Sequence, residues 1–129
     1  MNGADNSEKI KYRIQLSVST LSEATVIKDL GYFSTALNRY YYACFYAVTA
    51  LLLTKELNPK THAGVRTLFN LHFVQPGIVP FEFGQFYGQL FDKRQRSDYD
   101  DYLDADEETV DNLSVFAIEF IDKIKKIII

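Results

Sequence analysis

A run of apolar and aromatic residues in the middle of the chain most constrains how it can fold. From Tyr40 to Leu53 almost every side chain is apolar or aromatic, and four of the chain's nine tyrosines lie at the beginning of this run. A helix that is apolar on all sides is buried by neighbouring elements on all sides. We therefore expect residues 33–56 to form the central helix of a bundle, with two polar residues, Asn38 and Arg39, near its beginning.

The segment before the central helix is predicted to form a helix over residues 7–29. Apolar side chains recur there at helical spacing, which indicates one buried face. They are Ile10, Ile14, Val18 and Leu21. Gly31 follows as a helix stop signal. The central helix is expected to end before Asn58-Pro59, because proline disfavours helical geometry in the residue that precedes it.

Three further helices are predicted in the second half of the chain. Thr61 is a candidate N-cap for a helix that extends to about residue 73. A fourth helix follows Pro80 and leads into the polar segment 93–102. The acidic stretch 104–108 suits the positive end of a last helix. The last helix has a buried stripe formed by Val110, Leu113, Ala117, Phe120, Ile121 and Ile124.

These patterns predict an all-α fold. No segment alternates between apolar and polar residues with a period of two, so strands are not expected. The predicted architecture is an up-and-down antiparallel bundle of four to five helices with a central, aromatic-rich second helix. At 129 residues, the chain is expected to form a single domain over residues 1–129.

Composition narrows the classes of function. The formal net charge is −3, whereas dedicated nucleic-acid binders are usually basic, so any RNA contact must come from a local patch or an oligomer. The single cysteine, Cys44, is predicted to be a core residue in a reducing compartment. The apolar run 43–53 is too short for a membrane span, which needs about 20 residues. No apolar signal region begins the chain, so a cytoplasmic location without membrane contact is expected.

No motif in the sequence indicates a cofactor or metal site. There is no glycine-rich phosphate loop, no zinc-type spacing of cysteine and histidine, and no Ser-x-Gly elbow. The phenylalanines of residues 81–91 and the isoleucines 127–129 nevertheless exceed what a small core obviously needs. A hydrophobic dimer interface, a cofactor cavity, and packing of the tail inside the monomer are the alternatives.

The polar segment 94–102 is the first candidate site. Arginine binds phosphate through a planar, permanently charged fork, and RNA cleavage by transfer to the adjacent ribose hydroxyl also needs groups that accept and donate protons. The catalytic candidates are Arg94, Arg96, Tyr99 and Tyr102, with Asp98 as a nucleotide contact. In the structural alternative, Arg94 pairs with Asp98 and Arg96 with Asp100 at helical spacing, and Tyr99 is a packing residue.

Three further residues are candidates for nucleotide or RNA binding. Asn38 and Arg39 must be hydrogen-bonded or reach water if the helix that carries them is central. Arg39 either adds a second cation beside Arg94 or pairs with a carboxylate such as Asp98 and ties two helices together. His62 lies at a helix start, where anions are favoured, and it is either a ligand-binding residue or a capping and packing residue.

Three strings in the chain resemble the HEPN family (higher eukaryotes and prokaryotes nucleotide-binding domain), in its small stand-alone prokaryotic branch. They are the segments 37–48 (LNRYYYACFYAV), 60–64 (KTHAG) and 94–99 (RQRSDY). The resemblance covers nearly the whole chain in the right order and spacing. It implies an antiparallel bundle that forms a homodimer face to face. It also implies pairing with a minimal nucleotidyltransferase as a toxin–antitoxin or related stress system.

Many members of that family are metal-independent ribonucleases. Their usual motif is an arginine followed, after four to six residues, by a histidine near the end of a late helix, and the dimer brings two copies together. In this chain four residues separate Arg94 from Tyr99, and five separate Arg96 from Tyr102, so tyrosine stands where histidine is usual. The resemblance thus implies an RNA- or nucleotide-linked toxin or defence component, with a non-catalytic module that binds a nucleotidyltransferase or another partner as the alternative.

Overall fold

The computed structural model describes the backbone of residues 3–99 and 105–129, and the side chains of residues 6–95 and 105–129. The described residues form helices and no strands, so the all-α prediction is confirmed. The elements are α1 (Gly3–Asp29), α2 (Phe33–Leu53), α3 (His62–Phe69), the π-helical turn η1 (Asn70–Val74), α4 (Phe81–Tyr99) and α5 (Glu107–Ile128). Among these elements, none is long and apolar enough to cross a membrane.

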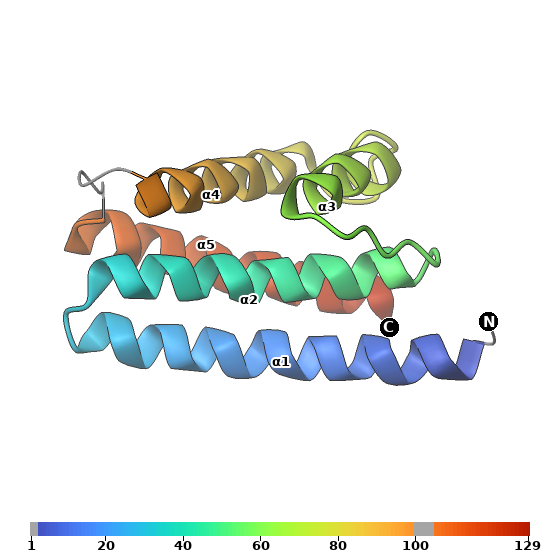
Figure 1. Ribbon diagram of the computed structural model, residues 1–129, viewed down its shortest axis with the longest axis horizontal. Coiled ribbons are helices and arrows are strands. Elements are labelled where there is room, and N and C mark those ends of the chain that lie inside the picture. The colour runs from blue at the N-terminus through green and yellow to red at the C-terminus, as the bar shows by residue number, and fades with distance from the viewer. Residues whose placement is uncertain (1–2, 100–104) are drawn as a thin grey trace.

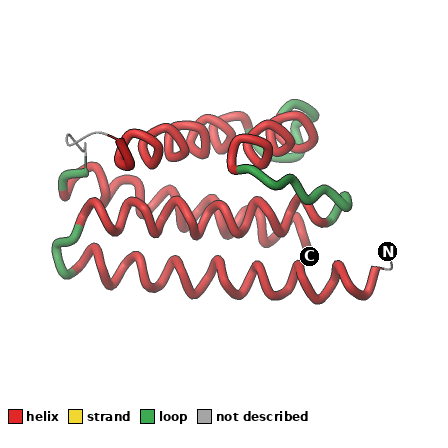
Figure 2. The backbone as a smooth tube through the Cα atoms, in the orientation of Figure 1, coloured by secondary structure: helices red, strands yellow, loops and turns green. Residues whose placement is uncertain are grey.

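The helix α2 is central in the bundle. Figure 1 shows α1 and α2 side by side and antiparallel, with α5 behind α2 and α4 on the side away from α1. The loops lie at the two ends of the bundle, as Figure 2 shows. The helix α2 contacts α1, α3, α4 and α5. Tyr40, Tyr41 and Cys44 have no solvent exposure, which agrees with the all-round apolar character of their segment.

The described residues of the middle of α1 that are fully buried are small. Ser17, Thr20 and Ala24 are buried there, whereas Val18 is 39% exposed, so the predicted stripe is wrong at Val18. The Ser17 hydroxyl donates a hydrogen bond to the carbonyl of Ala43 at 2.6 Å. Small side chains let the two helices approach, and a buried hydroxyl needs such an acceptor. Apolar periodicity misses this face because serine and threonine count as polar.

The helix α5 closes the core with the stripe predicted for it. All six predicted residues, from Val110 to Ile124, are buried. The carboxylate of the N-cap residue Asp106 accepts a hydrogen bond from the backbone N–H of Thr109 at 2.8 Å, and this bond lowers the pKa of Asp106. The predicted role of the acidic stretch is therefore met by Asp106.

Aromatic rings join α4 to α5 inside the monomer. Phe83 and Phe86 contact Phe116, with ring centroids 5.3 and 4.5 Å apart, and Tyr87 stacks on Phe120 at 5.9 Å. Much of the aromatic surface of α4 is therefore used by the core. Phe81 is the exception at 68% exposure. Of the C-terminal isoleucines, 127 and 128 pack against the core, and residue 129 is exposed.

The segment from 53 to 74 departs from the predicted boundaries at two places. The helix α2 ends at Leu53 rather than near residue 56. The backbone N–H of Glu56 donates to the carbonyl of Leu53, and that of Leu57 to the carbonyl of Leu52, both at 3.0 Å. This is a Schellman ending with Glu56 in the left-handed conformation at φ 59°. The predicted N-cap Thr61 is confirmed, but α3 gives way to η1 at residue 70.

We predict that Glu56→Gly stabilises the fold. A residue with a β-carbon is strained at this φ, and glycine removes the strain, so the free energy of unfolding should rise by about 1 kcal/mol. Urea unfolding followed by circular dichroism measures the change. Glu56→Ala is the matched control, because it removes the same carboxylate and keeps the β-carbon. Equal stability of the two variants would contradict the assignment.

Candidate functional site

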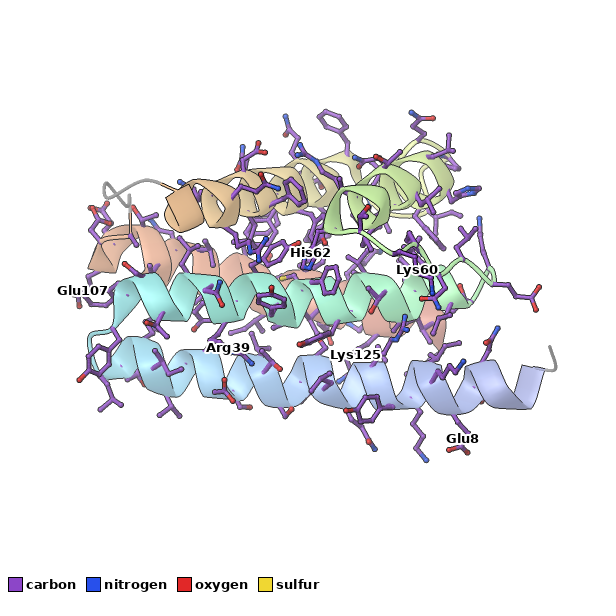
Figure 3. All side chains as sticks on the ribbon, in the orientation of Figure 1. Glu8, Arg39, Lys60, His62, Glu107 and Lys125 are labelled. Carbon is purple, nitrogen blue, oxygen red and sulfur yellow. The ribbon has the colours of Figure 1, made fainter. Side chains whose placement is uncertain are left out.

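One face of α2, between α1 and the pair α3–α4, is only partly covered. Half-buried residues recur along it at helical spacing: Asn38, Arg39, Tyr42, Phe45, Tyr46 and Thr49. We call this surface the α2 face. In Figure 3 the side chains of Arg39 and His62 lie on opposite borders of α2, toward α1 and toward α3 respectively. Most of the polar groups of α2 that reach solvent are therefore gathered on one side.

His62 is fixed on the α2 face by the first turn of α3. Thr61 caps this turn by accepting a hydrogen bond from the N–H of Gly64 at 2.9 Å. The Nδ1 atom of His62 lies 2.7 Å from the hydroxyl of Tyr41. Its ring stacks on Phe45 with centroids 4.3 Å apart and an interplanar angle of 12°. The imidazole is therefore held in position and orientation while it remains half-buried.

Arg94 of α4 reaches the same place from the other side. Its Nη2 atom donates a hydrogen bond to the hydroxyl of Tyr42 at 3.0 Å. Its guanidinium carbon lies 5.5 Å from the ring centroids of both Tyr41 and Tyr42, within the range of cation–π contacts. Arg94 has further interactions besides these. We call the five residues Arg94, His62, Tyr41, Tyr42 and Phe45 the Arg94–His62 cluster.

Burial and the arginine together favour a neutral imidazole in this cluster. Partial burial is the main cause that lowers the pKa of His62, and the positive charge of Arg94 lowers it further. Burial raises the pKa of Tyr41 to about 12. At neutral pH the cluster therefore combines a permanent cation with a neutral imidazole and a protonated phenol.

Arg39 lies on the α2 face but is bound to α1. Its Nε atom is 2.7 Å from a carboxylate oxygen of Glu23, and its guanidinium carbon is 5.9 Å from the ring centroid of Tyr42. The ion pair ties α2 to α1 through a carboxylate of the first helix, whereas the side chain of Asp98 lies outside the described residues. Asn38 is half-buried one position earlier.

The other predicted site residues cannot be placed in the cluster. The backbone of Arg96, Asp98 and Tyr99 belongs to α4, but their side chains lie outside the described residues, as does all of Tyr102. Their roles stay predictions. The residues brought together are Arg94 and His62, which lie 32 positions apart in the chain, because α3 and α4 pack on the same part of α2.

Tyr41, Tyr42 and Phe45 are the members of the cluster that were not predicted as site residues. The sequence did contain a signal for the two tyrosines, because a tyrosine buried in an apolar helix usually needs a hydrogen-bond partner for its hydroxyl. Ring packing alone would have placed them in the core. The structure shows that Tyr41 contacts His62 and Tyr42 contacts Arg94, so the two neighbouring hydroxyls hold the two separate polar groups.

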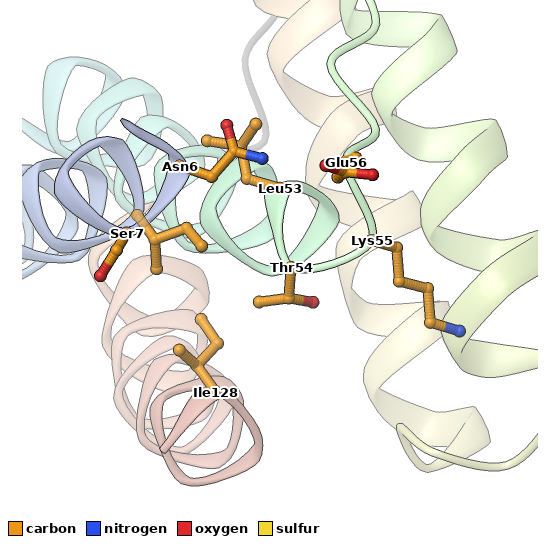
Figure 4. Close-up of a pocket in the computed structure, with 8 residues that line it drawn as sticks. Asn6, Ser7, Leu53, Thr54, Lys55, Glu56 and Ile128 are labelled. Atoms are coloured by element: carbon orange, nitrogen blue, oxygen red, sulfur yellow. The ribbon is translucent and has the colours of Figure 1, made fainter. Parts of the chain in front are cut away.

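The other described features of the molecule are weaker candidates for a functional site. Cys44 is fully buried, and burial raises the pKa of its thiol, as expected of a core residue. A cavity of about 500 Å³ lies where the ends of α1, α2 and α5 meet, and Figure 4 shows its lining, which includes Asn6, Lys55 and Ile128. It contains none of the predicted site residues. Within the described residues, no group of histidine, cysteine and acidic side chains could hold a metal ion.

Comparison with known proteins shows relatives along nearly the whole chain. Residues 10–127 match the HEPN domain family. A UPF0332 protein of Thermotoga maritima is 38% identical over 119 residues, which cover 92% of this chain and 90% of the relative. A protein of Methanocaldococcus jannaschii that is named "Putative toxin" is 36% identical over 95% of this chain and 90% of its own length. A second protein of that organism with the same description is 32% identical over 90% of this chain and 79% of its own length.

We predict that His62 makes the fold less stable as the pH falls through the slightly acidic range. The pKa of His62 is lower in the folded state than in the unfolded chain, so the unfolded chain binds more protons as the pH falls through about 6.5. The free energy of unfolding should therefore decline between pH 7 and pH 5.5. His62→Gln should decline less over this range in urea unfolding. A steeper decline in the variant would contradict the direction of the pKa shift.

Proposed function

The chain belongs to the HEPN family, and we propose that it is a toxin-like protein that acts on RNA at the Arg94–His62 cluster. The names of two relatives support the toxin-like part of this proposal. The observation that carries the RNA part is the meeting of an arginine, an imidazole and two phenol groups on a half-buried face. This combination suits a phosphate group beside a nucleobase.

Each residue of the cluster has a property that RNA recognition uses. Arg94 carries the positive charge and the forked hydrogen-bond donors that suit a phosphodiester. Tyr42 and Phe45 are half-buried aromatic rings on which an unpaired base can stack. The net charge of −3 means that binding depends on this local surface rather than on the charge of the whole chain.

RNA cleavage without a metal is the finer form of the proposal. The family's usual motif combines one arginine with a histidine that follows it; in this chain tyrosine follows, and the proposal is that His62 of α3 provides the imidazole beside Arg94 of α4. Arginine would stabilise the charge that develops on the phosphorane. The predicted residues Arg96, Tyr99 and Tyr102 follow Arg94 in the chain and remain candidates for the same reaction.

Two partners belong to this proposal. The first is a second copy of the chain, which would place two clusters across a symmetric interface. The second is a minimal nucleotidyltransferase that acts as the antitoxin. Size-exclusion chromatography with light scattering tests the homodimer, and co-expression with a neighbouring nucleotidyltransferase gene tests the antitoxin by relief of growth inhibition.

A non-catalytic interaction module is the second candidate function. It is favoured by one observation, namely that the members of the cluster satisfy one another. Arg94 is bonded to Tyr42 and lies over two rings, and His62 is bonded to Tyr41 and covered by Phe45. A purely structural role, in which Arg94 joins α4 to α2, is sufficient to account for these contacts. In that case RNA binding is not expected, and the module binds a partner protein.

We predict that Arg94→Gln abolishes growth inhibition and weakens RNA binding by roughly tenfold or more, since it removes a charged hydrogen-bond donor to phosphate. Binding to a single-stranded oligoribonucleotide is measured by fluorescence anisotropy, and cleavage by gel analysis of cellular RNA after expression. Arg66→Gln is the matched control. Arg66 also lies over an aromatic ring, 5.0 Å from Phe91, and pairs with Asp92 outside the cluster.

The comparison of the two variants separates the candidate functions. The toxin-like proposal expects Arg66→Gln to retain growth inhibition and RNA binding, while Arg94→Gln loses both. Retention of both activities by folded Arg94→Gln would contradict the site. Growth inhibition by Arg94→Gln together with a wild-type chain that does not bind RNA would favour the interaction module.

A further inference from the structure

The hydrogen bond between Tyr41 and His62 has a direction that the surrounding groups determine. The Tyr41 oxygen and His62 Nδ1 are 2.7 Å apart, and either atom can be the donor. Tyr41 has no solvent exposure, so water cannot accept its hydrogen. Within the described residues, the Tyr41 hydroxyl forms one hydrogen bond of good geometry, and its partner is His62.

Tyr87 is a further polar group beside Tyr41, in addition to His62 and Arg94. Its ring stacks on that of Tyr41 with centroids 6.1 Å apart, and its hydroxyl is fully buried. Its oxygen meets no hydrogen-bond donor of good geometry in the described part of the chain. Tyr41 therefore does not donate its hydrogen to Tyr87.

The direction of the Tyr41–His62 hydrogen bond determines which ring nitrogen of His62 carries the proton. If Nδ1 donated to Tyr41, the hydrogen of the buried Tyr41 hydroxyl would have no acceptor, which is costly in the core. If Tyr41 donates to Nδ1, the hydrogen of the buried Tyr41 hydroxyl has an acceptor. A neutral imidazole whose Nδ1 accepts must carry its proton on Nε2.

We propose that Tyr41 is a positioning residue that holds neutral His62 in the Nε2–H tautomer, so that the cluster binds a phosphate group with His62 as a hydrogen-bond donor. Tyr42 contributes in the same sense. Its oxygen accepts a hydrogen bond from Arg94, so its own hydrogen is directed away from that guanidinium and can be donated to a ligand. The ligand that complements an Nε2–H, a phenol O–H and a neighbouring guanidinium is an anion with several acceptor oxygens.

The identity of this phosphate as part of RNA rests on the proposed function, whereas the tautomer does not. A phosphodiester of an RNA chain and the phosphate of a free nucleotide offer the same acceptor oxygens. In either case His62 orients and polarises the phosphate and does not accept a proton at Nε2. His62→Gln should therefore keep phosphate binding, since the glutamine amide also donates, and His62→Ala should lose it.

Long-range proton–nitrogen NMR on uniformly ¹⁵N-labelled protein measures the tautomer. The chain has two histidines, so the spectrum of His72→Gln assigns the ring signals of His62. We expect the Nε2–H pattern for wild-type His62 above its pKa. Tyr41→Phe removes the donor to the neutral ring and should raise the pKa of His62 by roughly half a pH unit. Tyr42 and Arg94 are the other described polar groups that act on His62, and both are unchanged in this variant.

Tyr46→Phe is the matched control, because Tyr46 contacts Tyr42 and Phe45 on the α2 face without a hydroxyl bond to His62. It should leave both the tautomer and the pKa of His62 unchanged. The Nδ1–H tautomer in the wild type, or a lower pKa of His62 in folded Tyr41→Phe, would overturn the inference. Circular dichroism establishes that both variants are folded.

The ligand is tested by adding inorganic phosphate, AMP and a single-stranded oligoribonucleotide in separate titrations. Movement of the His62 Nε2–H signal with any of them supports the phosphate site, and the tightest of the three identifies the source. No movement with all three overturns the phosphate part. Response to phosphate or AMP without response to RNA contradicts the proposed function alone, so the two failures are distinguishable.

Discussion

The burial of α2 on nearly all sides is the constraint on which the structure depends. The helix contacts every other α-helix of the bundle, and its aromatic and small apolar residues leave little room for polar groups. A hydroxyl on such a helix needs a partner from a neighbouring element. The tyrosines of α2 therefore determine which groups of α3 and α4 lie beside them, and the candidate site is a consequence of how the core satisfies its polar atoms.

The same contacts that stabilise the bundle would hold the cluster in place for the proposed ligand. Tyr41 fixes His62 through Nδ1, Phe45 supports the imidazole from one side, and Tyr42 holds Arg94. Groups fixed in this way lose little conformational entropy when a phosphate binds. The electrostatic balance also agrees with the proposed binding, because burial, and to a lesser extent the charge of Arg94, lowers the pKa of His62 and favours the neutral imidazole. Structural and functional roles of these residues are therefore compatible.

The fold could be predicted further than the site. Periodicity located α5 and its six buried residues, and capping signals located Thr61 and the helix end at Gly31, where φ is 90°. Periodicity failed on α1, where Ser17 and its neighbours form the buried face. Arg94 and His62 were each recognised as candidates, but no local pattern indicates that residues 32 positions apart meet. Their contact depends on tertiary packing around Tyr41 and Tyr42.

A crystal structure of the chain with a short, single-stranded RNA that carries non-hydrolysable linkages would test the central claim most directly. The account predicts one phosphate group within hydrogen-bond distance of Arg94 and of His62 Nε2, with Tyr41 still bonded to Nδ1. A phosphate bound elsewhere on the molecule, or an imidazole turned so that Nε2 faces Tyr41, would contradict it.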